Sequence, residues 1–167
     1  MDPFTDVLAA NADYTRTFSD AGTPGKAARG LAVITCMDSR ISPLEMLGLE
    51  KGDAKILRNA GARVTDDVLR TLVLAVHLLE VDRVLVVPHT DCRMTKVTDD
   101  QVHQEILARG FDTRSLEFRT IDDQVEALRC DVQRIRSSPY LPKGLPVLGC
   151  VYSVSTGALR VEVPAEP

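Results

Sequence analysis

The sequence has no tryptophan and few aromatic residues of any kind. Aromatic side chains make up 4% of its 167 residues, whereas hydrophobic residues reach 44%. The core must therefore be built from Val, Leu, Ile and Ala side chains, and the chain is long enough for one domain with a sizeable core. We expect residues 1–167 to form a single domain.

Long apolar runs and a strong charge imbalance are also missing. No run approaches the ~20 apolar residues that span a bilayer, so no transmembrane helix is expected. The net charge of -4, with scattered basic residues, indicates neither nucleic-acid nor membrane-surface binding. The segment Met1-Asp2-Pro3-Phe4 lacks the basic and then apolar pattern of a signal peptide, so we expect a cytoplasmic protein. In that reducing compartment the four cysteines should be free or metal-bound.

Apolar, β-branched runs alternate with helical patterns along the chain. The expected strands are 31–35, 54–57, 83–88, 146–154 and an antiparallel edge strand at 158–163. The expected helices lie within 1–20, after Thr65, and at 99–109 and 122–136, and a further short helix starts at Ser42-Pro43. This alternation predicts an α/β fold with a central, mostly parallel sheet flanked by helices. Residues 1–30 should form an N-terminal helical arm and a loop.

Three residues of metal-binding types follow two of these strands. Cys36 comes after the first strand, and His89 and Cys92 come after the third. Ligands of parallel sheets gather at the carboxyl ends of strands, so the three side chains converge if the two strands are neighbours. Two thiolates and one imidazole leave one position of a tetrahedral zinc open, as in catalytic sites. The spacing His-x-x-Cys also occurs by chance; its placement after a strand favours the metal site.

Asp38 and Arg40 lie two and four residues beyond the first predicted ligand. They could form a bidentate pair that keeps Asp38 ionised. Asp38 would then orient a zinc-bound hydroxide, or it would ligate zinc itself and close the site. The third alternative is an ordinary surface ion pair of little energetic value.

Four segments resemble the β-class carbonic anhydrases, in particular the short bacterial and archaeal members. They are Cys36–Arg40, Arg58–Gly61, Val64–Arg70 and His89–Cys92. The resemblance implies one zinc per subunit on Cys36, His89 and Cys92, a catalytic pair of Asp38 and Arg40, and reversible hydration of carbon dioxide to bicarbonate. It also implies an N-terminal helix that packs on a partner subunit, in a homodimer or a higher homo-oligomer.

One residue departs from the pattern of that family. Glycine usually follows the second cysteine, whereas this chain has Arg93. The change adds bulk and charge, which could attract bicarbonate or crowd the carbon dioxide site, and it strains the backbone if φ is positive. Ala60 and Gly61, at the end of the second strand, are predicted with Arg93 to line the substrate pocket; a purely structural turn is the alternative for the first two.

Other functions remain open at this point. One is a catalytically weak or inactive zinc-binding homologue, and another is a zinc hydrolase that acts on a carbon dioxide analogue such as carbon disulfide. A cysteine-nucleophile phosphatase is disfavoured, because its phosphate loop needs five residues between Cys and Arg. Only Met37, Asp38 and Ser39 separate Cys36 from Arg40 here.

Overall fold

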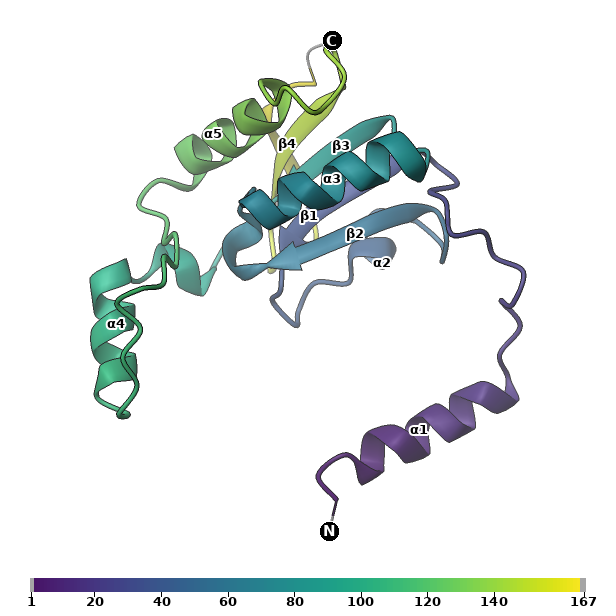
Figure 1. Ribbon diagram of the computed structural model, residues 1–167, viewed down its shortest axis with the longest axis horizontal. Helices are drawn as coiled ribbons and strands as arrows, with labels where there is room; N and C mark the ends of the chain where they lie inside the picture. The colour runs from purple at the N-terminus through teal and green to yellow at the C-terminus, as the bar shows by residue number, and fades with distance from the viewer. Residues whose placement is uncertain (1, 166–167) are drawn as a thin grey trace.

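The computed structural model describes residues 2–165. This range contains five strands and five α-helices (Figure 1). The strands are β1 (Leu31–Cys36), β2 (Ala54–Asn59), β3 (Arg83–Val87), β4 (Val147–Tyr152) and β5 (Leu159–Val163). The helices are α1 (Thr5–Arg16), α2 (Pro43–Met46), α3 (Asp66–Leu78), α4 (Asp99–Leu107) and α5 (Gln124–Arg136). Each predicted element is present, with its ends shifted by a few residues. The parts of our predictions that concern residues 1, 166 and 167 lie outside the described residues.

The strands form one sheet in the order β2-β1-β3-β4-β5. Strands β1 to β4 are parallel, and β5 pairs with β4 in the antiparallel direction. The predicted α/β fold with an antiparallel edge strand is therefore confirmed. The chain leaves β1 for β2 on one side and then crosses to β3 on the other side. This reversal of direction makes the carboxyl ends of β1 and β3 the switch point where such sheets bind ligands.

Polar side chains cap the helices that flank the sheet. The hydroxyl of Thr65 accepts a hydrogen bond from the Val68 N–H at 3.4 Å and begins α3 where the sequence predicts. Thr98 and Gln101 form a reciprocal capping box at α4, and Asp123 accepts two backbone N–H groups at the start of α5. These caps fix the entry of each helix relative to the strand ends.

The two faces of the sheet are covered unequally. Helices α3 and α5 lie over one face (Figure 1), and their buried residues form the larger core together with Ile34, Val84 and Val86. The other face presents Val33, Leu85 and Val87, with side chains next to the short α2 packed against them. A cavity of ≈ 390 Å³ opens near the amino ends of the strands, and its lining includes Leu31, Leu85, Leu148, Arg29 and Arg83.

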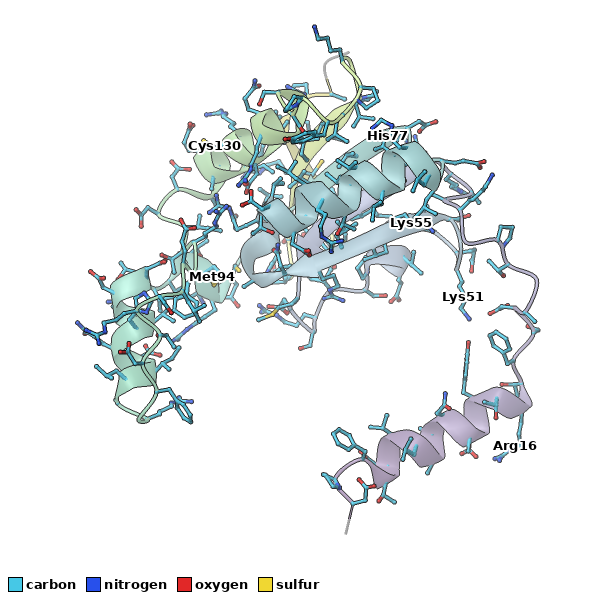
Figure 2. The ribbon with its side chains drawn as sticks, in the orientation of Figure 1. Arg16, Lys51, Lys55, His77, Met94 and Cys130 are labelled. Carbon is cyan, nitrogen blue, oxygen red and sulfur yellow. The ribbon has the colours of Figure 1, made fainter. Side chains whose placement is uncertain are left out.

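Two helices stand away from the sheet. Helix α1 extends from one side of the body and contains no buried residue, so the predicted arm is a helix that its own subunit leaves uncovered (Figure 1). Lys51 reaches toward it from the body, donates to the Tyr14 hydroxyl at 2.8 Å and pairs with Asp20 (Figure 2). Helix α4 projects from the body at the opposite side of the view from α1 and also has no buried residue (Figure 1). Over residues 2–165, no helix has both the length and the apolar character needed to cross a bilayer.

Candidate metal centre and active site

The structure brings Cys36, His89 and Cys92 together at the switch point. Cys36 ends β1, and His89 follows the end of β3 by two residues. Strands β1 and β3 are hydrogen-bonded neighbours, so the two loops leave the sheet side by side. One ligand atom from each residue lies within 4.8 Å of the other two, and all three residues are buried. The sequence predicted that the three side chains converge if these two strands are neighbours, and the structure shows that they are.

The distances and hydrogen bonds of this cluster fit a zinc ion. The Sγ atoms of Cys36 and Cys92 are 3.9 Å apart, and two thiolates on one tetrahedral zinc would lie about 3.8 Å apart. The Nδ1–H of His89 donates to the carbonyl oxygen of Thr90 at 2.8 Å, so Nε2 is the free acceptor. This Nε2 is buried and has no hydrogen-bond partner among the described residues, which is costly unless a metal occupies it.

Close contacts within the cluster shift the pKa of each of its three residues. The hydrogen bond between the sulfur atoms of Cys36 and Cys92 lowers the pKa of Cys36 to about 4 and raises the pKa of Cys92. Burial alone lowers the pKa of His89, but the nearby Cys36 and Asp38 and the Thr90 carbonyl outweigh burial and raise that pKa. Zinc binding must therefore release protons from this site.

Asp38 and Arg40 form the predicted bidentate pair. The Nε and Nη2 of Arg40 donate to the two carboxylate oxygens of Asp38 at 2.9 and 2.8 Å, and the backbone N–H of Arg40 adds a third bond. These bonds hold the pKa of Asp38 well below its usual range. The Oδ2 of Asp38 lies 3.7 Å from the Nε2 of His89. An ionised carboxylate thus lies beside the cluster, with both oxygens engaged by Arg40.

A short turn after β2 contacts the ligand cluster. The 3₁₀ helix Ala60–Ala62, which the sequence did not predict, begins where β2 ends. The N–H of Gly61 donates to the Sγ of Cys36 at 3.4 Å, and φ at Gly61 is 79°. Ala60 is half-buried at the start of this turn. A pocket-lining role for Ala60 and Gly61 stays a prediction; what the structure adds is that Gly61 supports a ligand.

Arg93 lies away from the ligand cluster. Its guanidinium donates to both carboxylate oxygens of Glu105 on α4, at 3.1 and 2.9 Å, and its side chain is 67% exposed. Among the described non-glycine residues, positive φ angles occur at Ala62, Glu80, Asp91 and Arg119, so Arg93 has no such strain. The structure therefore removes one reason for which this substitution could harm the site. Its proposed contact with bicarbonate stays a prediction.

Four contacts of the site, made by three side chains, were not predicted from the sequence. Arg40 also donates to Asp91 Oδ2 at 2.8 Å, and the Gln124 side-chain amide donates to the carbonyl of His89 at 2.8 Å. Arg58 donates to the carbonyls of Cys36 and Asp38 at 3.0 and 2.6 Å. Asp91 could have been noticed as a charge inside the His89–Cys92 motif. Nothing in the sequence links Gln124 to a residue 35 positions away.

These features define a class of protein before any comparison is made. The chain is a doubly wound α/β protein whose switch point carries three buried zinc-type ligands and an adjacent ionised carboxylate. Three protein ligands are typical of catalytic zinc rather than structural zinc. The class is therefore that of α/β proteins with a candidate catalytic metal site at the switch point of the sheet.

Comparison with known proteins gives the family. The family model described as carbonic anhydrase matches residues 31–159. The chain belongs to the β-carbonic anhydrase family. The match contains every predicted site residue, from Cys36 to Arg93, and extends through β4 to the first residue of β5.

Individual relatives cover almost the whole chain. Beta-carbonic anhydrase 1 of Mycobacterium tuberculosis is 35% identical over 159 residues, which are 95% of this chain and 97% of the relative. The crystal structure of a carbonic anhydrase from Streptococcus mutans superposes with a TM-score of 0.91 at 35% identity, and covers 98% of this chain and 99% of that one. A carbon disulfide hydrolase of Acidianus sp. is 30% identical over 159 residues, which are 79% of this chain and 76% of the relative.

Proposed function

We propose that this chain catalyses the reversible hydration of carbon dioxide to bicarbonate, with one zinc per subunit held by Cys36, His89 and Cys92. The observation that carries the proposal is the buried ligand cluster, whose His89 Nε2 has no hydrogen-bond partner in the described structure and lies 3.7 Å from the ionised Asp38. Membership of the β-carbonic anhydrase family supports the same activity. Carbonic anhydrases of this kind are lyases.

Bound zinc would supply a water that ionises near neutral pH, ~7, and is thereby a nucleophile toward carbon dioxide. Asp38 acts beside it as a fixed hydrogen-bond acceptor. Because the pKa of Asp38 lies well below its usual range, its carboxylate is too weak a base to keep a proton at neutral pH. Its role is therefore to orient the nucleophile, and the proton must leave by another route. Arg40 fixes the carboxylate through two parallel hydrogen bonds.

Metal analysis combined with stopped-flow carbon dioxide hydration from about pH 6 to 9 tests this function. We expect stoichiometric zinc and a hydration rate that rises with pH. Cys36→Ala should lose both zinc and activity, whereas Asp38→Asn should keep zinc and lose activity. Cys130→Ala is the matched control, since Cys130 is a free thiol exposed on α5 away from the metal loops (Figure 2). A zinc-loaded wild type without hydration at any pH would reject the proposal.

Hydrolysis of carbon disulfide is the second candidate, because relatives with that name share 30% identity with this chain. The two substrates have the same linear shape, so the ligand cluster alone does not separate them. Parallel assays of both substrates on one zinc-loaded preparation decide between them. We expect carbon dioxide to be the better substrate, since relatives that carry the carbonic anhydrase name match a larger share of the chain.

We also propose that the functional unit is a homodimer in which α1 packs on the partner subunit. Phe4, Val7 and Leu8 at the start of this arm are 60–64% exposed, and α1 contains no buried residue. One face of the sheet carries, in addition, an apolar cavity near the short α2. Burying an exposed side chain of this size in a partner is worth roughly 1.5–3 kcal/mol. A second copy of the chain would bury both surfaces.

Analytical ultracentrifugation tests the dimer. Replacing Val7 and Leu8 with Asp should shift the wild-type dimer toward monomer at micromolar concentration. Leu78→Asp is the control, because Leu78 is 66% exposed on α3 and outside the arm. A wild-type monomer, or a double variant that still dimerises, would contradict this part of the proposal. We also propose a cytoplasmic location, because thiolate ligands and the exposed Cys130 suit a reducing compartment.

A further inference from the structure

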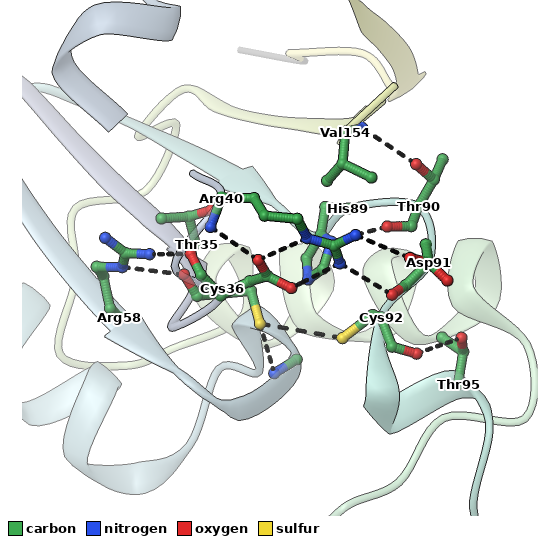
Figure 3. Close-up of polar contacts among 12 residues, drawn as sticks. Thr35, Cys36, Arg40, Arg58, His89, Thr90, Asp91, Cys92, Thr95 and Val154 are labelled. Atoms are coloured by element: carbon green, nitrogen blue, oxygen red, sulfur yellow. Dashed lines mark hydrogen bonds and ion pairs between the residues drawn. The ribbon is translucent and has the colours of Figure 1, made fainter. Parts of the chain in front are cut away.

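Arg40 connects the two loops that carry the predicted zinc ligands. Its Nε and Nη2 contact Asp38, on the loop after β1. Its Nη1 donates to the Oδ2 of Asp91 at 2.8 Å, and its Nη2 also contacts the Asp91 carbonyl at 3.2 Å. Figure 3 shows the guanidinium of Arg40 spanning from its own loop to Asp91, on the loop after β3. The guanidinium is thus held between two carboxylates from separate parts of the chain.

Asp91 is itself fixed in place. It lies between His89 and Cys92, so ligands on both sides restrain its backbone, and its φ is 58°. The second carboxylate oxygen, Oδ1, pairs with Lys96. One oxygen of Asp91 is therefore occupied by Lys96, while the other faces Arg40. This geometry lets the loop after β3 set the position of Arg40.

We propose that Asp91 is a positioning residue for the hydration reaction: it holds Arg40 so that Arg40 presents Asp38 to the open metal position. The inference rests on the proposed function for its catalytic consequence. Arg58, on β2, holds the backbone carbonyl of Asp38. That contact does not reach the guanidinium of Arg40, which can change direction together with the Asp38 carboxylate unless a group outside their loop fixes it. The Arg40 side chain is 45% exposed, and solvent alone would leave it free to change rotamer. Asp91 supplies the outside contact.

The positive φ at Asp91 determines which variants are informative. Asparagine and glycine both tolerate this conformation, whereas alanine would add backbone strain. Asp91→Asn removes the charge, and Asp91→Gly removes the whole side chain. We expect both variants to retain stoichiometric zinc and to lose roughly 10-fold in kcat for carbon dioxide, the size of a typical coupling between contacting residues. KM should change little, because Asp91 does not touch the substrate.

A double-mutant cycle with Arg40→Ala separates positioning from general stabilisation. If Asp91 acts through Arg40, the Arg40→Ala/Asp91→Asn double variant will be no slower than Arg40→Ala alone. Losses that multiply would refute the proposal, as would a wild-type kcat in Asp91→Gly. Asp67→Asn is the matched control, because Asp67 pairs with Arg70 on the exposed surface of α3. Its kcat should equal that of the wild type.

A second measurement does not depend on activity. The Nε–H group of Arg40 gives an NMR resonance that Arg40→Lys removes and thereby assigns. We expect this proton to exchange with solvent several-fold faster in zinc-loaded Asp91→Gly than in the wild type; unchanged exchange would overturn the proposal. A wild type inactive toward carbon dioxide would reject the proposed function instead, and the exchange rate would still decide whether Asp91 holds Arg40.

Discussion

The backbone N–H of Gly61 lies 3.4 Å from the Sγ of Cys36 and donates a hydrogen bond to it. Cys36 ends β1 and Gly61 follows β2, so this bond joins the turn after one strand to the ligand that ends its neighbour. A donor aimed at a thiolate stabilises the charged form, and it helps to lower the pKa of Cys36. The glycine of the Arg58–Gly61 segment is therefore part of the support of the metal site.

Gly61→Ala should weaken that support. Position 61 has φ of 79°, and an added Cβ would lie 3.1 Å from the Ile121 side chain and 3.3 Å from that of Met94. Strain at positive φ costs alanine about 1–2 kcal/mol, and the crowding adds to this cost. We expect a lower free energy of unfolding and weaker zinc binding in competition with a chelator.

Gly157→Ala is the control for backbone strain alone. Gly157 has φ of 74°, and a Cβ added at this position would meet no atom within 4 Å. This variant should lose a similar backbone contribution but keep wild-type zinc affinity. Equal zinc affinities in all three proteins would show that the backbone strain and crowding at position 61 do not reach the ligand.

Arg93→Gly restores the residue that the family favours and should have little effect. The Arg93 side chain points to Glu105, and both partners of this ion pair are more than half exposed. Such a pair contributes roughly 0–1 kcal/mol. We expect kcat/KM for carbon dioxide to stay within about two-fold of the wild type, since less than about 0.4 kcal/mol of barrier separates them.

Glu105→Gln provides the comparison for Arg93. It breaks the same ion pair but leaves the cation free to swing toward the metal loops. If Arg93 attracts bicarbonate or crowds the substrate, the two variants will change kcat/KM in opposite directions. If both variants keep the wild-type kcat/KM, the role of the Arg93 side chain is its ion pair with Glu105 on α4.

Local patterns in the sequence were sufficient to predict the elements and to pick out the three candidate ligand residues. Apolar β-branched runs predicted the strands, and Thr65 with its two following aspartates predicted the start of α3. Cys36 and His89 could be brought together because parallel strands share one carboxyl edge. Their convergence also requires that β1 and β3 be neighbours, and only the structure shows this.

The contacts that support the ligand residues could not be predicted from the sequence, for a physical reason. The acceptor for the His89 Nδ1–H is the carbonyl of Thr90, and every residue type has such a carbonyl. Likewise, the position of the Arg93 side chain depends on where α4 lies relative to the metal loop, which no local pattern determines. Asp91 carried a charge in a recognisable motif, but its partner Arg40 is 51 residues away in the sequence.

Arg63 and Asp131 form an ion pair, and its loss should lower the free energy of unfolding far more than loss of the Arg93–Glu105 pair. The Nε of Arg63 donates to Asp131 Oδ2 at 2.6 Å, and the two side chains are 18% and 7% exposed. The pair ties the turn after β2 to α5. Asp131→Ala leaves the Arg63 charge largely buried without its partner, so we expect urea unfolding to show a loss of about 3 kcal/mol.

Asp67→Ala is the matched control for Asp131, because it breaks an Asp–Arg pair whose side chains are 76% and 67% exposed. Its effect should stay within about 0.5 kcal/mol. A double replacement, Arg63→Met with Asp131→Leu, should recover part of the lost stability by removing the isolated charge. If Asp131→Ala costs no more than Asp67→Ala, burial does not strengthen this pair.

Asp99 should make the stability of the α4 region depend on pH. Its carboxylate accepts backbone N–H groups of Phe118, Arg119 and Thr120, at 2.9, 3.3 and 2.9 Å, and the Thr120 hydroxyl at 2.6 Å. The Thr120 hydroxyl and these N–H groups lower the pKa of Asp99 to about 2. An unfolded aspartate has a pKa of ~3.9, so ionised Asp99 stabilises the fold above that pH, and this stabilisation disappears as the pH falls toward 2.

Urea unfolding of the wild type and Asp99→Asn at several pH values tests this dependence. The wild type should be more stable by a difference that is constant above about pH 5 and shrinks between about pH 4 and pH 2. Loss of the metal in acid affects both proteins alike and cancels in the difference. Asp100→Asn, in the same helical turn but exposed, should show no such change with pH. A wild-type advantage that is the same at every pH would mean that Asp99 acts through its shape and not through its charge.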